Sequence, residues 1–521
     1  MKSLTCVDRR QSRRLVEALA ALGAAALVLL AACAQTPAKP APAAAPVDAA
    51  WLERVTYGVD GATLASYRRL GRAEFMDLEL GLRAASLPAA VQAEIDALEI
   101  THANTERLLA DVNTENKRIN ALTDNAEKEQ ARKVLNDRGN LLAYEAARRH
   151  LLRAVYAPDQ LREQLVWYWL NHFSVHQYKA NLRWLVADYE ERAIRPHVLG
   201  HFRDLVLATL RHPAMLQYLD NAQNAAGHVN ENYARELMEL HTLGVDAGYT
   251  QADVQALAHI MTGVGLNTGP APNLKPEWRS LYLRDGAFEF NPARHDFSSK
   301  QLLGHTVGGR GFREVEEAVD ILVHQPACAR FVARGLAQYF VADSPPPALL
   351  ERMARTFTAT DGDLAAVMRT MLDAPEFRAS LGGKFKDPMH YLVSAVRLAY
   401  EGRVIVNTHP LVNWLNALGE PLYGRQTPDG YPLGESGWAS SGQVSRRFEI
   451  AKTIGSGSGG LFDPEDGSHP ASGGFPQLAN RVYFDAIEPR LSPTTRTALD
   501  RATSQVEWNA FLLASPEFNY R

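Results

Sequence analysis

The segment from Leu87 to Tyr156 constrains the fold most, because it is long, rich in charged residues and nearly free of glycine and proline. Its apolar residues include Leu98, Leu109 and Ile119, which are spaced for one buried helical face. The pattern predicts an antiparallel helical hairpin with its tip near residues 113–116 and a solvated outer face. We expect this projecting hairpin either to contact a partner protein or to support the fold.

Helical periodicity continues through most of the remaining chain of 521 residues. The expected parts after the first 50 residues are a hairpin at about 87–156, a helical core at about 159–265, a loop at about 266–304, and C-terminal helices and loops at 305–521. Breaks between the core helices are predicted at Pro196, Pro213 and Gly227, and residues 419–475 are predicted to be loops. The fold class is therefore mainly α, a large multi-helix bundle with a projecting hairpin and a loop-rich C-terminal region.

Residues 1–32 have the form of a lipoprotein signal peptide. Arginines precede an apolar run from 15 to 30, and the sequence LAAC at 30–33 matches the cleavage box that precedes a lipidated cysteine. The alternative, a transmembrane helix, needs ~20 apolar residues, and this run is shorter. We expect an exported protein anchored in the cell envelope through Cys33, with a Pro/Ala-rich tether at 33–50, and the alanine after Cys33 favours the outer membrane.

Composition and cysteine usage limit the classes of function. The formal net charge is −4 with 22% charged residues, so the composition lacks the excess of basic residues that is typical of nucleic-acid-binding proteins. Removal of Cys6 with the signal peptide and lipidation of Cys33 leave Cys328 without a disulfide partner. The apolar neighbours of Cys328 favour a buried packing cysteine over a catalytic thiol.

The segment NENYARELMELHTLGV at residues 230–245 carries two candidate catalytic carboxylates on a short helix. At about 100° per residue, Asn232, Glu236 and Glu239 share one narrow sector and Arg235 lies at its edge. Asn232 and Arg235 would then support the two carboxylates. The alternative is a solvated face, because Arg235 is four residues from an acid on either side.

Two histidines follow an apolar stripe in WYWLNHFSVHQYK at residues 167–179. The stripe runs through Leu165 and Trp169 into His172 and His176, which are four residues apart. If the helix continues through His176, both imidazoles can face one ion. A lone histidine on an apolar face is more often a core residue, but the pair makes a ligand role as plausible as that alternative.

His172, His176, Glu236 and Glu239 together form a candidate metal centre. Neutral imidazoles and carboxylates on two helices suit a divalent ion such as zinc, iron or manganese. Asn171, next to His172, would be a supporting residue that helps to position the metal ligands.

His295 and Asp296 form a second candidate catalytic group, in the loop that contains FEFNPARHDFSSK, with Lys300 as a supporting residue. The histidine could act as a base, or the pair could ligate the metal. Adjacent residues in an extended segment point in opposite directions, so we do not expect His295 and Asp296 to bond each other. Capping of the loop by Asp296 is an equally good explanation.

Several stretches of the chain carry a family resemblance. They include LERVTYG (52–58), WYWLNHFSV (167–175), LDNAQN (219–224), NENYARELMELHTLGV (230–245), FNPARHDFSSKQLLG (290–304), KFKDP (384–388) and LGEPLYG (418–424). In this order they make the chain similar to the bacterial domain-of-unknown-function 1800 family, over about residues 51–521. The resemblance implies an exported bacterial protein without a settled activity. It also implies a partner from a second uncharacterised family that is similar to sulfatases or phosphatases, because genes of the two families often lie together.

The expected function is that of a cell-envelope lipoprotein acting as a metal-dependent hydrolase on an envelope or extracellular polymer. A bound divalent ion would bring the pKa of its water near neutrality, and a spare carboxylate would act as base. Two alternatives remain open. One is a metal-free, glycan-acting enzyme that uses Glu236 and Glu239. The other is a non-catalytic scaffold or assembly lipoprotein that uses the hairpin as its interaction arm.

Overall fold

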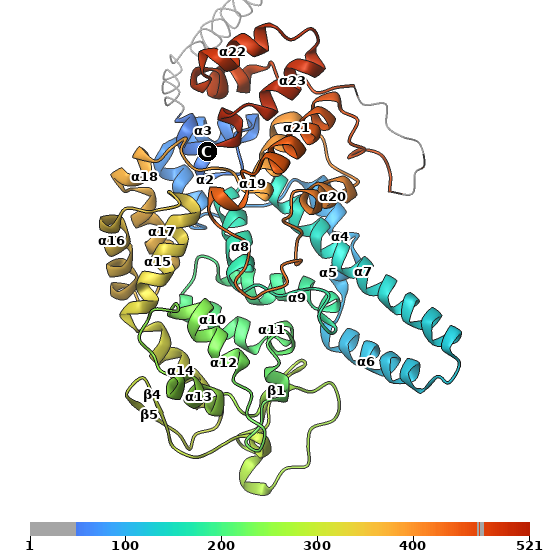
Figure 1. Ribbon diagram of the computed structural model, residues 1–521, viewed down its shortest axis with the longest axis vertical. Helices are drawn as coiled ribbons and strands as arrows, with labels where there is room; N and C mark the ends of the chain where they lie inside the picture. Colours follow the sequence, from blue (N-terminus) through green and yellow to red (C-terminus); the bar gives the residue numbers. More distant parts are fainter. Residues whose placement is uncertain (1–47, 466–467, 469–473) are drawn as a thin grey trace, which may run out of the picture. The chain divides into compact units, whose positions relative to one another are not determined.

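A computed structural model describes residues 48–465, 468 and 474–521, which form a mainly helical fold (Figure 1). The mainly α fold class predicted from the sequence is thus confirmed. The signal peptide, Cys33 and nearly all of the tether lie outside the described residues. No helix within the described ranges has both the length and the apolar character needed to cross a bilayer.

The N-terminal helices lead into an antiparallel pair. They are α2 (Ala49–Val55), α3 (Gly61–Glu79), α4 (Ala89–Asp96), α5 (Glu99–His102), α6 (Thr105–Ala121) and α7 (Asn125–Tyr156). Helices α6 and α7 pack against each other as a hairpin (Figure 1). The turn lies at 122–124, where the side chain of Asp124 caps α7, so the predicted tip at 113–116 is wrong. Asn113 lies on α6 instead and accepts a hydrogen bond from Asn181.

Helical segments from α8 to α13 fill the region predicted as the helical core. They are α8 (Gln160–His172), η1 (Leu182–Trp184), α9 (Val186–Asp188), η2 (Tyr189–Ile194), η3 (Arg195–His197), α10 (Phe202–Arg211), α11 (Pro213–Tyr218), η4 (Asn221–Gln223), α12 (Asn232–Glu236), η5 (Leu237–Thr242) and α13 (Gln251–Ile260). Segments η2 and η5 are π-helical. Pro213 begins α11, and the ring of His212 caps it by accepting a hydrogen bond from the amide of Ala214 at 3.1 Å.

Short strands occupy part of the region that the sequence predicted to be loop. They are β1 (Val264–Leu266), β2 (Leu283–Asp285), β3 (Phe288–Phe290), β4 (Lys300–Leu302) and β5 (His305–Val307), with 3₁₀ turns η6 (Pro276–Trp278) and η7 (Pro292–Arg294) between them. Antiparallel pairing in the order β1-β3-β2 places Val264 opposite Phe290. Gly263 has φ of +80°, and a Cβ there would lie 2.7 Å from the carbonyl oxygen of Asn291. Glycine is therefore needed where the loop containing His295 approaches the end of α13.

The C-terminal half returns to helix. Its elements are α14 (Phe312–Val323), α15 (Pro326–Phe340), α16 (Pro347–Ala359), α17 (Leu364–Leu372), α18 (Pro375–Ala379), α19 (Pro388–Ala399), α20 (His409–Ala417), η8 (Glu435–Gly437), α21 (Ser441–Ser456), η9 (Tyr483–Ile487), η10 (Glu488–Arg490), α22 (Pro493–Asp500), α23 (Gln505–Ala514) and η11 (Glu517–Asn519). Helix α21 corrects the prediction of loops throughout 419–475. Glycine and proline are concentrated on either side of it, Ser440 caps it, and it packs against α23.

A buried charge network joins several core elements around Arg195. Its guanidinium donates to Glu163 at 2.6 Å and to Glu190 at 2.9 Å. Glu190 also lies 3.1 Å from Nδ1 of His150 and accepts from the Tyr423 hydroxyl at 2.6 Å. All of these side chains are buried. Burial alone would raise the pKa of Glu190, but His150 and Arg195 outweigh it and hold that pKa well below its usual value. The network therefore links α7, α8, η2 and the loop that carries Tyr423.

Removing the central cation should be costly. We expect Arg195→Met to lower the free energy of unfolding by about 3–5 kcal/mol, because two buried carboxylates lose their shared partner. Arg83→Met is the control, since the ion pair of Arg83 with Glu74 is exposed and should contribute less than about 1 kcal/mol. Chemical denaturation of both variants measures the difference. Equal losses would contradict the stabilising role of the network.

Candidate functional site

His172 is the last residue of α8, and its ring packs among other rings rather than facing a ligand. Nε2 donates to the carbonyl oxygen of His241 at 3.0 Å. The ring centroids of Trp169 and Phe173 lie 5.2 and 4.7 Å away. Burial lowers the pKa of His172 to about 4, and the hydrogen bond to His241 opposes this only in part. The imidazole is therefore neutral at physiological pH.

His176 lies beyond the end of α8, because Phe173 already leaves the helix with φ −101° and ψ 51°. The two imidazoles were predicted to face one ion only if the helix continued through His176, and it does not. The ring of His176 instead packs near Tyr178, with ring centroids 5.5 Å apart, and contacts the backbone of Gly424. His172 and His176 thus have different surroundings.

Glu236 and Glu239 lie on α12 and η5 and are half-buried. Arg235 lies 3.8 Å from Glu239, and Tyr249 forms a hydrogen bond with the same carboxylate. Burial raises the pKa of Glu236, and the negative charges of Glu239 and Asp429 raise it further, whereas Arg235 lowers it. These contacts are those of a partly solvated ion-pair face, the alternative to a catalytic or metal site.

Asn171 and Asn232 bond to backbone groups. The side chain of Asn171 donates to the carbonyl oxygen of Tyr431 at 3.0 Å and accepts from its amide at 2.6 Å. Asn171 thereby holds the loop after Asp429 against α8. Asn232 is exposed and donates to the carbonyl oxygen of Leu219 at 3.1 Å.

The structure does not assemble the metal centre proposed from the sequence. In the part of the chain that the structure describes, no group of three or more histidine, cysteine, aspartate or glutamate side chains is placed to hold a metal ion. His172 is directed to His241, His176 has left the helix, and the carboxylates of Glu236 and Glu239 lie beside other charged groups. The physical reason is the end of α8 at His172, which removes the assumed helical spacing.

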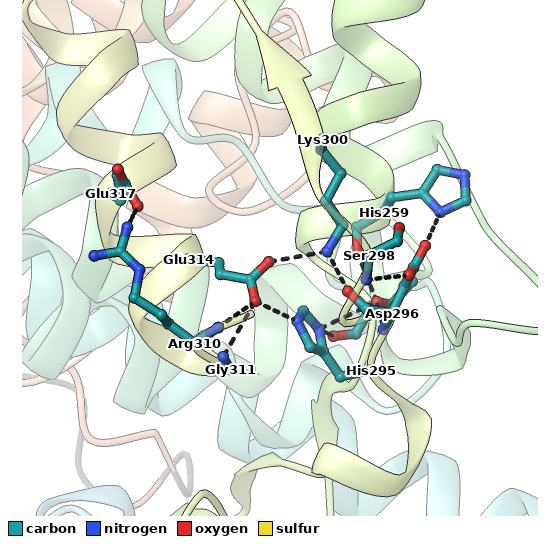
Figure 2. A network of polar contacts seen from close by, with 10 residues as sticks. His259, His295, Asp296, Ser298, Lys300, Arg310, Gly311, Glu314 and Glu317 are labelled. Carbon is teal, nitrogen blue, oxygen red and sulfur yellow. Dashed lines mark hydrogen bonds and ion pairs between the residues drawn. The ribbon is translucent and has the colours of Figure 1, made fainter. Parts of the chain in front are cut away.

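His295 is buried with both ring nitrogens occupied (Figure 2). Nδ1 lies 2.8 Å from the carbonyl oxygen of Thr262, and Nε2 lies 3.1 Å from Glu314. Lys300 donates to the other oxygen of Glu314 at 2.9 Å. Burial alone would raise the pKa of Glu314, but the hydrogen bonds from His295 and Lys300 outweigh it and lower the pKa to about 2. A general base needs a free nitrogen, so His295 does not fit the catalytic role predicted for it.

Asp296 points away from His295 and binds a histidine that the sequence analysis did not single out. Its Oδ2 lies 2.7 Å from Nδ1 of His259, and its Oδ1 accepts from the amide of Ser298 at 2.9 Å. Its own amide donates to the hydroxyl of Thr262 at 2.9 Å. Burial raises the pKa of Asp296, but hydrogen bonds from Ser298 and His259 outweigh it and lower the pKa to about 2. Asp296 therefore stays ionised.

His259, on α13, has one ring nitrogen bound and the other open. Its side chain is 40% exposed, and Figure 2 shows the ring at the edge of the network with Nε2 directed away from Asp296. Among the residues that the structure describes, none forms a hydrogen bond with Nε2. In the neutral form of the ring, Nδ1–H donates to the carboxylate and Nε2 carries the lone pair. This is the arrangement of a general base with an orienting carboxylate.

Sequence reasoning missed His259 and Glu314. His259 lies 37 residues before Asp296, and no local pattern marks the pair. Glu314 has a weak sequence signal, because it stands three residues after Gly311, in the position of a capping-box glutamate. In the structure its carboxylate accepts a hydrogen bond from the Gly311 amide. That signal predicts the start of α14 but not the bond to His295.

A family model described as "Protein of unknown function (DUF1800)" matches residues 50–520. The chain belongs to the DUF1800 family. No curated protein and no solved structure matches it. Membership of DUF1800 by itself assigns no activity to this DUF1800 protein.

Neutralising Glu236 in this DUF1800 protein should raise its melting temperature at neutral pH. The folded state disfavours the charged form, so stability is lost as the pH rises above ~4.3, the value in an unfolded chain. Glu236→Gln should therefore have the same melting temperature as the wild type at about pH 3 and a higher melting temperature than the wild type at about pH 7. Thermal melts at the two pH values test this. A lower melting temperature of the variant together with loss of bound metal would restore the metal hypothesis.

Proposed function

We propose that this DUF1800 protein is a hydrolase in which His259 is the general base and Asp296 orients it. The observation that supports the proposal is the 2.7 Å contact between Nδ1 of His259 and Asp296, which leaves Nε2 open at the surface. A histidine held in this way has a defined tautomer and a free lone pair.

In the proposed reaction, Nε2 of His259 removes a proton from a water molecule as the water oxygen attacks the electrophilic centre of an ester. A new bond to oxygen forms, the bond to the leaving oxygen breaks, and the imidazolium returns its proton to that leaving oxygen. Asp296 stabilises the imidazolium, because its low pKa keeps it negatively charged throughout. The Ser298 hydroxyl is bonded to Asp296, so water rather than this serine is the proposed nucleophile.

The network behind the pair keeps it in place. Lys300 donates both to Glu314 and to the carbonyl oxygen of Asp296. Glu314 also accepts from the amide of Arg310 at 2.8 Å, so the carboxylate that binds His295 and Lys300 is itself fixed at the start of α14. An orienting carboxylate on such a fixed loop loses little freedom when a substrate binds.

The open surroundings of His259 favour a polymeric substrate. Ser298 and Ser299, beside Asp296, are exposed, and the side chain of His259 is 40% exposed. A long chain can therefore reach Nε2 without entering an enclosed pocket. An envelope or extracellular polymer that carries ester groups is the substrate class that we propose.

Removing the base should abolish turnover without unfolding the protein. His259→Gln should lower kcat at least ~100-fold, the usual contribution of a general base. The free energy of unfolding should change by less than about 1 kcal/mol, because the contact between His259 and Asp296 is partly exposed. The wild-type protein is first screened on acyl, phosphate and sulfate esters and on envelope glycans to select the assay.

A matched surface pair provides the control. His324 lies 3.0 Å from Asp361 and is 61% exposed, but its other nitrogen already bonds to the carbonyl oxygen of Asp320. His324→Gln should leave turnover unchanged. Full activity in His259→Gln would refute the proposal. So would preferential modification by diethyl pyrocarbonate at His295 rather than at His259, because that reagent reports which ring nitrogen is open.

We also propose that the protein is lipid-anchored in the cell envelope at Cys33. The proposal is supported by the cleavage box at residues 30–33 and by the tether that follows it. Cys33→Ser should block processing or release the protein from membranes, as measured by fractionation and intact mass. An unchanged mass and unchanged membrane fraction would contradict the anchor.

A further inference from the structure

We propose that a cavity of about 370 Å³ between α3, α4, the end of α7 and α19 binds an uncharged apolar molecule, such as an alkyl chain or an aromatic ring. More of the wall surface is apolar than polar, and its apolar side chains include Phe75, Val91, Val155, Val396, Tyr400 and Val404. A concave site with an apolar wall and few polar groups is the usual form of a small-molecule pocket. The cavity shares no lining residue with the His259–Asp296 pair.

Several polar groups in the wall are already paired. Arg397 pairs with Asp60 at 2.8 Å and donates to the hydroxyl of Thr63 at 2.8 Å. The hydroxyl of Tyr156 donates to the carbonyl oxygen of Arg403 at 2.6 Å. These paired groups need no hydrogen bond from a ligand, so an apolar ligand can lie against them without breaking a polar contact.

The charges around the cavity balance. Asp60 and Glu401 are the acids in its lining, and Arg397 and Arg403 are the bases. The guanidinium of Arg403 also lies 3.4 Å from the centre of the Phe462 ring, so it is covered on one side. Neither an anion nor a cation gains a net electrostatic advantage here, which favours an uncharged occupant.

Two tyrosines in the wall, the half-buried Tyr156 and the buried Tyr400, add no charge to it. Burial raises the pKa of Tyr156 and of Tyr400 to about 12, so both phenols remain uncharged at physiological pH. The exposed lining residues lie at the first turn of α3, before α4, after α7 and in the turn after α19, and they are Ala62, Ser86, Pro88, Pro158, Glu401 and Gly402. They mark the opening through which a ligand would enter.

Fluorescence titration with N-phenyl-1-naphthylamine, an uncharged apolar dye, tests the site. Wild-type protein should bind the dye saturably with one site per chain. Ala62→Phe fills the opening and should weaken binding at least tenfold. Ala65→Phe is the matched control, because Ala65 is an exposed alanine on the same helix outside the lining, and it should keep the affinity within about twofold. Saturable binding that Ala62→Phe does not weaken, or no saturable binding at all, would overturn the proposal.

Competition distinguishes the ligand class. Dodecanol should displace the dye at lower concentration than laurate or dodecylammonium, because only dodecanol has no charge to desolvate. Tenfold better displacement by either ion would overturn the assignment of an uncharged ligand. Dye binding is also independent of His259, so its outcome does not depend on the proposed hydrolase activity.

Discussion

The burial of two carboxylates beside one guanidinium is the constraint on which the core of this protein depends. Glu163 on α8 and Glu190 on η2 both bind Arg195, and Tyr423 and His150 complete the shell. Removing Arg195 leaves two carboxylates in a low-dielectric interior without their shared cation, so the elements that carry these groups must keep their relative positions. The position of α8 and of the loop that approaches its end follows from this requirement.

A second buried carboxylate has the same role at the candidate site. Glu314 accepts hydrogen bonds from the Arg310 amide, His295 and Lys300, and so binds the strand-and-loop region to the start of α14. His295 belongs to this structural arrangement. The pair that is accessible to solvent is formed on the opposite side of the loop, where Asp296 meets His259. The buried network therefore determines the geometry of the exposed pair.

The sequence identified the right segments but not the right contacts. Periodicity indicated the helical class and the hairpin, and Pro213 marked the start of a helix. The helical-wheel argument for a metal site failed at two places. Helix α8 ends at His172, four residues too early for the second imidazole, and the turn after Glu236 is π-helical rather than α-helical. A helix that is a few residues shorter, or that has a different pitch, directs its side chains to a different side of the helix.

Sequence alone determined the family, the helical composition and the local caps, because these depend on residues within a few positions of one another. It also restricted the loop geometry of His295 and Asp296, since adjacent extended residues point in opposite directions. Only the tertiary structure decided which titratable groups meet. Pairing of β1 with β3 at Gly263 brings Asp296 to a histidine 37 residues away, and α14 brings Glu314 to His295. Such contacts depend on the packing of whole elements, which no local pattern of residues encodes.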